Sequence, residues 1–225
     1  REHDAVLETA SELAHDWLTA AALINICNDS EAMSDLDRVE SAAREAVEIL
    51  ERLGDRTNLV MAHNYLGAVA YRRGLHLEGL GIFNQGLAIA VEHADRYNIG
   101  HQRYHRGLCL TALDRHDEAL EDYQAALEIA HEFDEPNLLA SAVEAYAERS
   151  SEREEFTDAV IFLSLADRIR AERSVPQREG NVRGVEKMRT RLHAALSEDD
   201  YSRGEAEGRV LSVEEMVARV RARSA

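Results

Sequence analysis

The sequence has few of the residues that mark several common protein classes. It contains 2 prolines, 2 cysteines and 1 tryptophan among 225 residues, so neither a disulfide-rich secreted scaffold nor a Pro-rich linker is expected. No apolar stretch approaches the roughly 18 residues that a membrane-spanning helix needs. A hydrophobic fraction of 45% beside 31% charged residues is typical of a folded, soluble helical domain and not of a disordered chain.

Basic charge is also scarce. The chain carries 26 Lys and Arg residues against 43 Asp and Glu, for a net charge of −17. Because phosphate binding requires a concentrated basic face, we expect no nucleic-acid contact by this segment. A weak basic run over residues 183–191 contains Glu186, and we interpret it as a solvated helix face rather than a DNA contact.

Motifs for catalysis and metal binding are missing as well. The sequence has no phosphate-binding loop, no Gly-x-Ser-x-Gly elbow and no His-Glu-x-x-His pair, so we expect no catalytic residues and no cofactor. His101 and His105 share a helix face, but zinc needs further ligands that are not evident, and we expect no metal. Cys27 and Cys109 lack the spacing of a metal clip or redox pair and are interpreted as buried, reduced thiols of a cytoplasmic protein.

Small residues recur with a period of 40. Four positions repeat together: Gly67, Gly107 and Ala147; Gly79, Ala119 and Ala159; Phe83, Tyr123 and Leu163; Gly86, Ala126 and Ala166. Antiparallel helices approach closely only where side chains are small, and a large side chain four residues later fills the next gap. The unit is therefore a helical hairpin, with helices predicted near 58–72 and 76–92. Such hairpins must stack to bury their apolar faces.

These patterns predict an all-α, right-handed αα-solenoid with a C-terminal helical cap. Repeats are expected over residues 17–54, 57–94, 97–134 and 137–175, after a partial unit at 4–14, with the cap over 176–225. Gly54 is expected as a left-handed helix end, and Trp17 at the first repeat junction. Because the chain starts at Arg1 without a signal peptide, we interpret it as a piece of a longer protein.

Within the cap, one helix is predicted from Arg178 to Leu196, followed by a polar stretch over residues 197–201. Ser212 and Glu215 have the spacing of a capping box, which predicts the start of a last helix. A terminal unit with a more polar outer face closes a solenoid.

Two parts of the sequence resemble known families. The run Asn64–Gly67, with Ala70, Tyr71, Gly79, Phe83 and Gly86, resembles the tetratricopeptide repeat. The tail, through Glu207-Gly208-Arg209 and residues 211–215, resembles the carboxyl-terminal end of bacterial signalling ATPases of the LuxR/AfsR-like (STAND) type. That resemblance implies a transcriptional or signalling regulator with an ATPase domain before the repeats. Family members often carry a large aromatic residue near Glu205, whereas this chain has no aromatic residue after Tyr201.

The first helix of each hairpin is expected to line the concave face. The register places twelve residues there: Met61, Asn64, Ala68, Tyr71, His101, Tyr104, Leu108, Thr111, Ser141, Glu144, Glu148 and Ser151. The candidate partner-binding residues are Asn64, Tyr71, His101, Tyr104, Glu144 and Glu148. An Asn amide can both donate to and accept from a peptide backbone, and Tyr adds flat contact area. Alternatively, Asn64 cross-links neighbouring helices and the tyrosines pack between repeats.

We therefore expect a non-catalytic module that docks a protein or peptide on its concave face, or that restrains the ATPase domain of its parent chain. One alternative is a small-molecule receptor with a pocket around Asn64, Tyr104 and Glu144. Another is a self-association scaffold that forms homo-oligomers.

Overall fold

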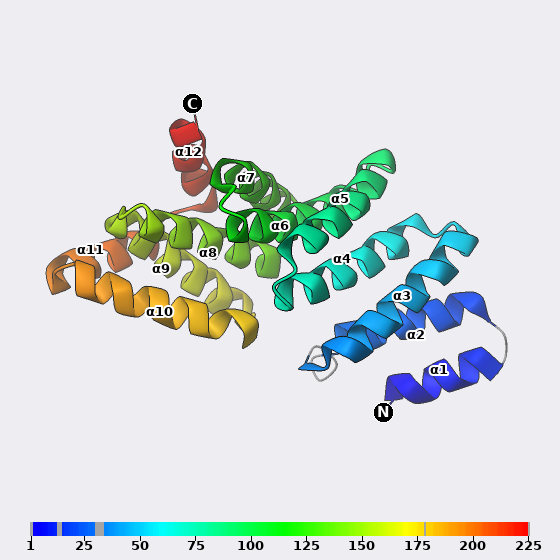
Figure 1. The fold of residues 1–225 in the computed structure, drawn as a ribbon. Helices are drawn as coiled ribbons and strands as arrows, with labels where there is room; N and C mark the ends of the chain where they lie inside the picture. Colours follow the sequence, from blue (N-terminus) through cyan, green and yellow to red (C-terminus); the bar gives the residue numbers. More distant parts are fainter. Residues whose placement is uncertain (1, 13–14, 30–33, 178, 225) are drawn as a thin grey trace. The chain divides into compact units, whose positions relative to one another are not determined.

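The described part of the chain consists of helices and the short irregular segments that join them. A computed structural model describes residues 2–12, 15–29, 34–177 and 179–224, and no strand occurs among them. Its helices are α1 Glu2–Glu12, α2 Asp16–Asn28, α3 Leu36–Leu53, α4 Arg56–Arg72, α5 His76–Glu92, α6 Arg96–Ala112, α7 His116–Glu132, α8 Pro136–Glu152, α9 Phe156–Arg173, α10 Glu179–Ala195, α11 Glu198–Gly208 and α12 Val213–Ser224 (Figure 1). The predicted all-α solenoid class is confirmed. Residues 13, 14 and 178, included in two predicted helices, lie outside the described residues.

Helices α2 to α9 begin at regular intervals. Their first residues are 16, 36, 56, 76, 96, 116, 136 and 156, so a new helix starts every 20 residues. The helices predicted near 58–72 and 76–92 correspond to α4 and α5, although α4 begins at Arg56. Each 40-residue unit of the sequence is therefore two helices and two turns.

The turns follow the same interval. Residues with positive φ occur at positions 54, 74, 94, 114, 134, 154 and 174. A left-handed residue ends a helix because it turns the chain away while its own N–H still bonds the last carbonyls. Gly54 has φ 68° and ends α3 in this way, as predicted. Only positions 54 and 74 are glycine.

Carboxylates define where the first helix of a hairpin begins. Asp55 and Asp95 accept hydrogen bonds from the backbone N–H of Asn58 and Asn98, both at 3.1 Å. The side-chain amides of Asn58 and Asn98 donate back to the second carboxylate oxygen at 2.7 Å. Because capping satisfies backbone donors that the helix itself cannot, α4 and α6 start at equivalent positions.

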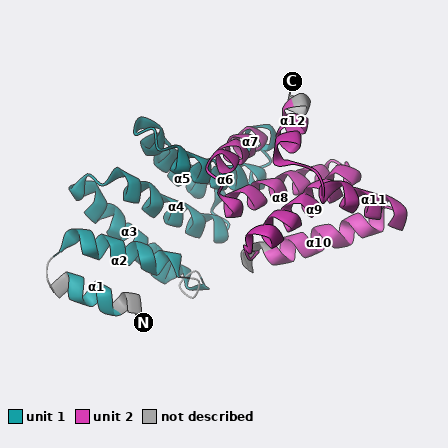
Figure 2. Cartoon of the chain, turned by 180° about the vertical axis from the view of Figure 1, so that it is seen from behind, with its two compact units in different colours: residues 1–119 teal, residues 120–225 magenta. Residues whose placement is uncertain are grey.

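The chain forms two compact units, residues 1–119 and residues 120–225 (Figure 2). In the first unit, each of the helices α1 to α6 packs on the next in chain order. In the second unit, α8 packs on α9, α11 packs on α9, and α10 contacts all three. The boundary between the units falls inside α7, and the division into a repeat region and a cap at residue 175 remains a prediction.

Close approach of α4 and α5 depends on the repeated small residues. A Cβ atom on Gly67 would lie 2.6 Å from the ring of Phe83, which is fully buried. On α5, a Cβ on Gly79 would lie 3.3 Å from the Gly67 carbonyl oxygen, and one on Gly86 would lie 2.9 Å from the Gln102 side chain. The small and large positions of the repeat thus interlock as the spacing predicts.

The polar stretch noted at residues 197–201 forms the N-cap and first turn of α11, a helix that the sequence analysis did not predict. The Ser197 hydroxyl accepts from the Asp200 N–H at 3.2 Å, and three acidic residues occupy the first turn, where the helix dipole favours negative charge. The face of α11 on α9 is made with glycine: a Cβ on Gly208 would lie 2.2 Å from the Ile161 carbonyl oxygen. A glycine contact face leaves no apolar periodicity to detect.

The structure bears on two further expectations. The capping box is confirmed, since Glu215 N–H donates to the Ser212 hydroxyl at 3.1 Å and Ser212 N–H donates to the Glu215 carboxylate at 2.9 Å. Trp17, expected at the first repeat junction, is 50% exposed, and its packing there remains a prediction. Trp17 lies in the first turn of α2, and the buried part of that helix begins only at Thr19.

We expect Gly67→Ala to lower the free energy of unfolding by about 1–3 kcal/mol, because the added methyl group would overlap the Phe83 ring. Gly81 offers a matched control, since it is exposed on α5 and a Cβ there meets nothing within 4 Å. Gly81→Ala should raise the free energy of unfolding by roughly 0.5–1 kcal/mol, because alanine favours a helix more than glycine does. Urea unfolding followed by circular dichroism measures both. Equal stabilisation of the two variants would show that this close approach does not limit packing.

Candidate functional site

The predicted partner-binding residues lie on three helices in two units. Asn64 and Tyr71 lie on α4, and His101 and Tyr104 on α6, all within residues 1–119. Glu144 and Glu148 lie on α8, within residues 120–225. We call the side of α4 and α6 that carries these residues the first-helix face of the first unit, and describe α8 of the second unit separately.

Asn64 has an acceptor that the fold does not use. The residue is half-buried, and its Oδ1 atom is buried without a hydrogen-bond partner. A buried polar atom left unsatisfied costs about 1–3 kcal/mol. Because Oδ1 is buried, a bound chain can donate to it only once the Asn64 side chain turns outward. Tyr71, half-buried on the same face, packs its ring 5.3 Å from that of His76.

On α6, the predicted residues take part in packing. Tyr104 is only 3% exposed, so its ring contributes to the interior. His101 is half-buried with its ring 4.8 Å from that of Tyr97. The His101 carbonyl accepts from His105 Nδ1 at 2.9 Å, and the His105 ring stacks on Phe83 at 5.5 Å. The described residues contain no group of three or more side chains suited to hold a metal ion.

In the second unit, Glu144 forms a buried ion pair. Its Oε1 atom accepts from Arg170 Nε at 2.8 Å, and the two side chains are 6% and 9% exposed. Arg170 also donates to the Pro176 carbonyl at 3.1 Å and contacts the Ser141 hydroxyl at 3.5 Å, and Gln177 donates to Glu144 at 3.3 Å. This network ties α8 and α9 to the segment before α10. No sequence signal paired Glu144 with Arg170.

Glu148 is the exposed one of the two predicted acids on α8. Its side chain is exposed, yet its pKa is raised above the usual value, chiefly by desolvation and then by the charges of Glu152 and Glu144. The surrounding protein thus removes part of its hydration without supplying a counter-charge. A cation bound beside Glu148 would relieve that repulsion.

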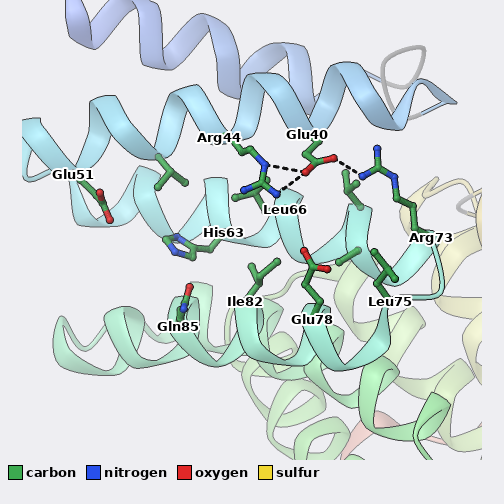
Figure 3. Close-up of a pocket in the computed structure, with 13 residues that line it drawn as sticks. Glu40, Arg44, Glu51, His63, Leu66, Arg73, Leu75, Glu78, Ile82 and Gln85 are labelled. Carbon is green, nitrogen blue, oxygen red and sulfur yellow. Dashed lines mark hydrogen bonds and ion pairs between the residues drawn. The ribbon is translucent and has the colours of Figure 1, made fainter.

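A separate cavity of about 330 Å³ lies between α3, α4 and α5 (Figure 3). It is lined by Glu40, Arg44, Val47, Glu51, His63, Leu66, Val69, Ala70, Arg73, Leu75, Glu78, Ile82 and Gln85. At 3.6 residues per turn, the α4 members His63, Leu66 and Ala70 lie about 120° around the helix from Asn64 and Tyr71. We call this cavity the α3–α5 groove. Sequence analysis missed it because packing of three helices creates it.

Comparison with known proteins identifies a repeat within the chain. Residues 102–133 match the tetratricopeptide repeat. A search of curated protein sequences gives no match. Among solved structures, the fold is similar to BtubC (BKLC) from P. vanneervenii, with a TM-score of 0.67 and 16% identity over 99% of this chain and 89% of that chain.

These comparisons identify one tetratricopeptide repeat in the chain and an all-helical fold shared with a solved structure. Tetratricopeptide repeats generally mediate protein–protein interactions and are typically non-catalytic. The described residues also include no helix that is both long enough and apolar enough to cross a membrane.

We expect Glu144→Gln to lower the free energy of unfolding by about 3–5 kcal/mol, because it leaves the buried Arg170 charge uncompensated. The matched control is Glu152→Gln on the same helix, whose ion pair with Arg149 is more exposed and should contribute only about 0.2–1 kcal/mol. Thermal unfolding measures both.

A second variant covers the case in which Glu144→Gln does not fold. Glu144→Leu with Arg170→Met replaces both charges with apolar groups and should recover most of the lost stability. Similar losses in Glu144→Gln and Glu152→Gln would contradict the structural role of the buried pair.

Proposed function

We propose that the chain is a non-catalytic docking module that binds a protein or peptide on its first-helix face. The observation that carries this proposal is the Asn64 Oδ1 atom, a buried acceptor without a partner. Once the Asn64 side chain turns towards solvent, a backbone N–H of a bound segment is the donor that suits this oxygen. The tetratricopeptide match at residues 102–133 supports the general mode of action.

Charge indicates the chemistry of the partner. The net charge of −17 attracts basic chains over a distance and raises their rate of association. Glu148, whose pKa is raised by desolvation and by neighbouring carboxylates, suits a Lys, an Arg or an amino terminus. We therefore expect a basic peptide whose affinity falls as the salt concentration rises.

We further propose that the module serves a bacterial multidomain signalling or transcriptional regulator with an ATPase domain. The resemblance of the tail around Glu207-Gly208-Arg209 to such proteins supports this context. Binding would then act on the parent protein by favouring one of two conformations, and the coupling would be the difference in binding free energy between them.

The small-molecule alternative has less support. Of its three predicted residues, Tyr104 is buried and Glu144 is paired with Arg170. Asn64 Oδ1 and Glu144 Oε2 are both buried without a hydrogen-bond partner, but Glu144 is already committed to Arg170. A ligand pocket needs several convergent polar groups, which favours an extended peptide bonded along the helix face.

To test the proposal, a random peptide display library is selected on the chain, and the tightest peptide is titrated by calorimetry. Asn64→Ala should weaken binding about tenfold, because a hydrogen bond of roughly 1.4 kcal/mol is lost. Asn84→Ala, an exposed amide on α5 that accepts from Arg106 at 3.2 Å, is the matched control and should bind as the wild type does.

Equal affinity of the two variants would contradict docking through Asn64. A mass that rises with concentration in sedimentation, with no peptide selected, would favour the self-association scaffold instead.

A further inference from the structure

We infer that the α3–α5 groove is a second docking site, which takes a basic amphipathic helix from another protein. This site goes beyond the proposed function because its floor is a different side of α4 from the side that carries Asn64. The two sites can therefore be disabled separately.

The centre of the groove is apolar and incompletely covered. Val47, Leu66 and Ile82 come from α3, α4 and α5 in turn, and each is only partly buried. Val47 and Leu66 border the buried core of the first unit. A volume of about 330 Å³ is at the lower end for ligand pockets and suits a few aliphatic side chains. The apolar stripe of a helix supplies such a set.

The lining residues follow the helix axes. On α3 they are Glu40, Arg44, Val47 and Glu51, which lie on one face because they are three or four residues apart. The eleven steps from Glu40 to Glu51, at 1.5 Å per step, give a length of about 16 Å. A ligand helix of about three turns has the same length, with anchors at i, i+4 and i+7.

Charge selects a basic partner. Both arginines of the groove are already neutralised: Arg44 pairs with Glu40 at 2.6 Å, and Arg73 pairs with Glu40 and Asp37. These contacts hold the pKa of Glu40 below its usual value.

Two other carboxylates of the groove are not paired with an arginine. Glu51 and Glu78 are exposed, and neither forms an ion pair with another residue in the described part of the chain. Figure 3 shows them towards opposite ends of the groove, on α3 and α5. A helix with Lys or Arg at both ends of its apolar stripe complements this arrangement.

His63 adds a polar contact on the floor. Its Nδ1 atom lies 2.9 Å from the Leu59 carbonyl oxygen, which can only accept, so Nδ1 carries the hydrogen. In the neutral imidazole, Nε2 is then an acceptor. Figure 3 shows the ring close to Gln85 at one end of the groove, where a donor on the bound helix would meet it.

The test uses three fluorescent synthetic helices of about 14 residues that share one Leu stripe and carry Lys, Gln or Glu beside it. Fluorescence anisotropy measures their binding to the whole chain. The Lys helix should bind tightest and the Glu helix weakest, with a difference of about tenfold or more that shrinks at high salt.

Charge reversal locates the site. Glu51→Lys with Glu78→Lys should weaken the Lys helix about tenfold. Glu48→Lys with Glu92→Lys is the matched control, because both residues are exposed on α3 and α5 outside the groove; it should change affinity less than about twofold. Circular dichroism confirms that both variants fold. Asn64→Ala should leave binding of the Lys helix unchanged.

Several results would overturn the inference: no binding of the Lys helix, equal affinity for the Lys and Glu helices, or equal losses in the two charge-reversal variants. Loss of binding in Asn64→Ala would place the helix on the first-helix face instead. A concentration-dependent mass that Ile82→Lys abolishes would assign the groove to a second copy of the chain.

Discussion

The contact between the Phe83 ring and the bare Cα of Gly67 fixes how closely α4 and α5 approach. A methyl group at Gly67 would already overlap the ring, so the two helices could not keep this separation with any other residue there. The same hairpin holds Gly79 against the backbone of α4 and Gly86 against Gln102 of α6. Because α4 is held against both α3 and α5, one of its sides forms the floor of the α3–α5 groove and another carries Asn64.

The turns keep this interlock in register. A left-handed residue every 20 positions, from Gly54 to Ser174, ends each helix at an equivalent place. Asp55 and Asp95 then start the first helices through matching hydrogen bonds to Asn58 and Asn98. Equal helix lengths bring the small and large residues of successive hairpins to the same heights. Local caps thus determine the tertiary spacing.

Features that depend on nearby residues were predictable from the sequence. The period of 40, α4 and α5, the Gly54 helix end and the Ser212–Glu215 capping box all follow from spacings of a few residues. Long-range features were not. The Glu144–Arg170 pair joins two helices, and α11 packs through Gly204 and Gly208 rather than an apolar stripe.

How deeply each candidate site residue is buried was equally unpredictable from the sequence. Helix periodicity places Asn64 and Tyr104 at equivalent positions of two repeats, yet one keeps an unsatisfied oxygen and the other is buried. Periodicity gives the side of a helix but not the depth to which neighbouring helices cover it. The α3–α5 groove likewise depends on how far α3 and α5 stand apart over α4.

Native-state hydrogen exchange tests most directly whether the Gly67–Phe83 contact organises the first unit. If it does, amides in the middle of α4 and α5 should exchange slowest in that unit and share one opening free energy, because neither helix can open without the other. Exchange of the α4 amides through an opening that leaves α5 protected would contradict the account.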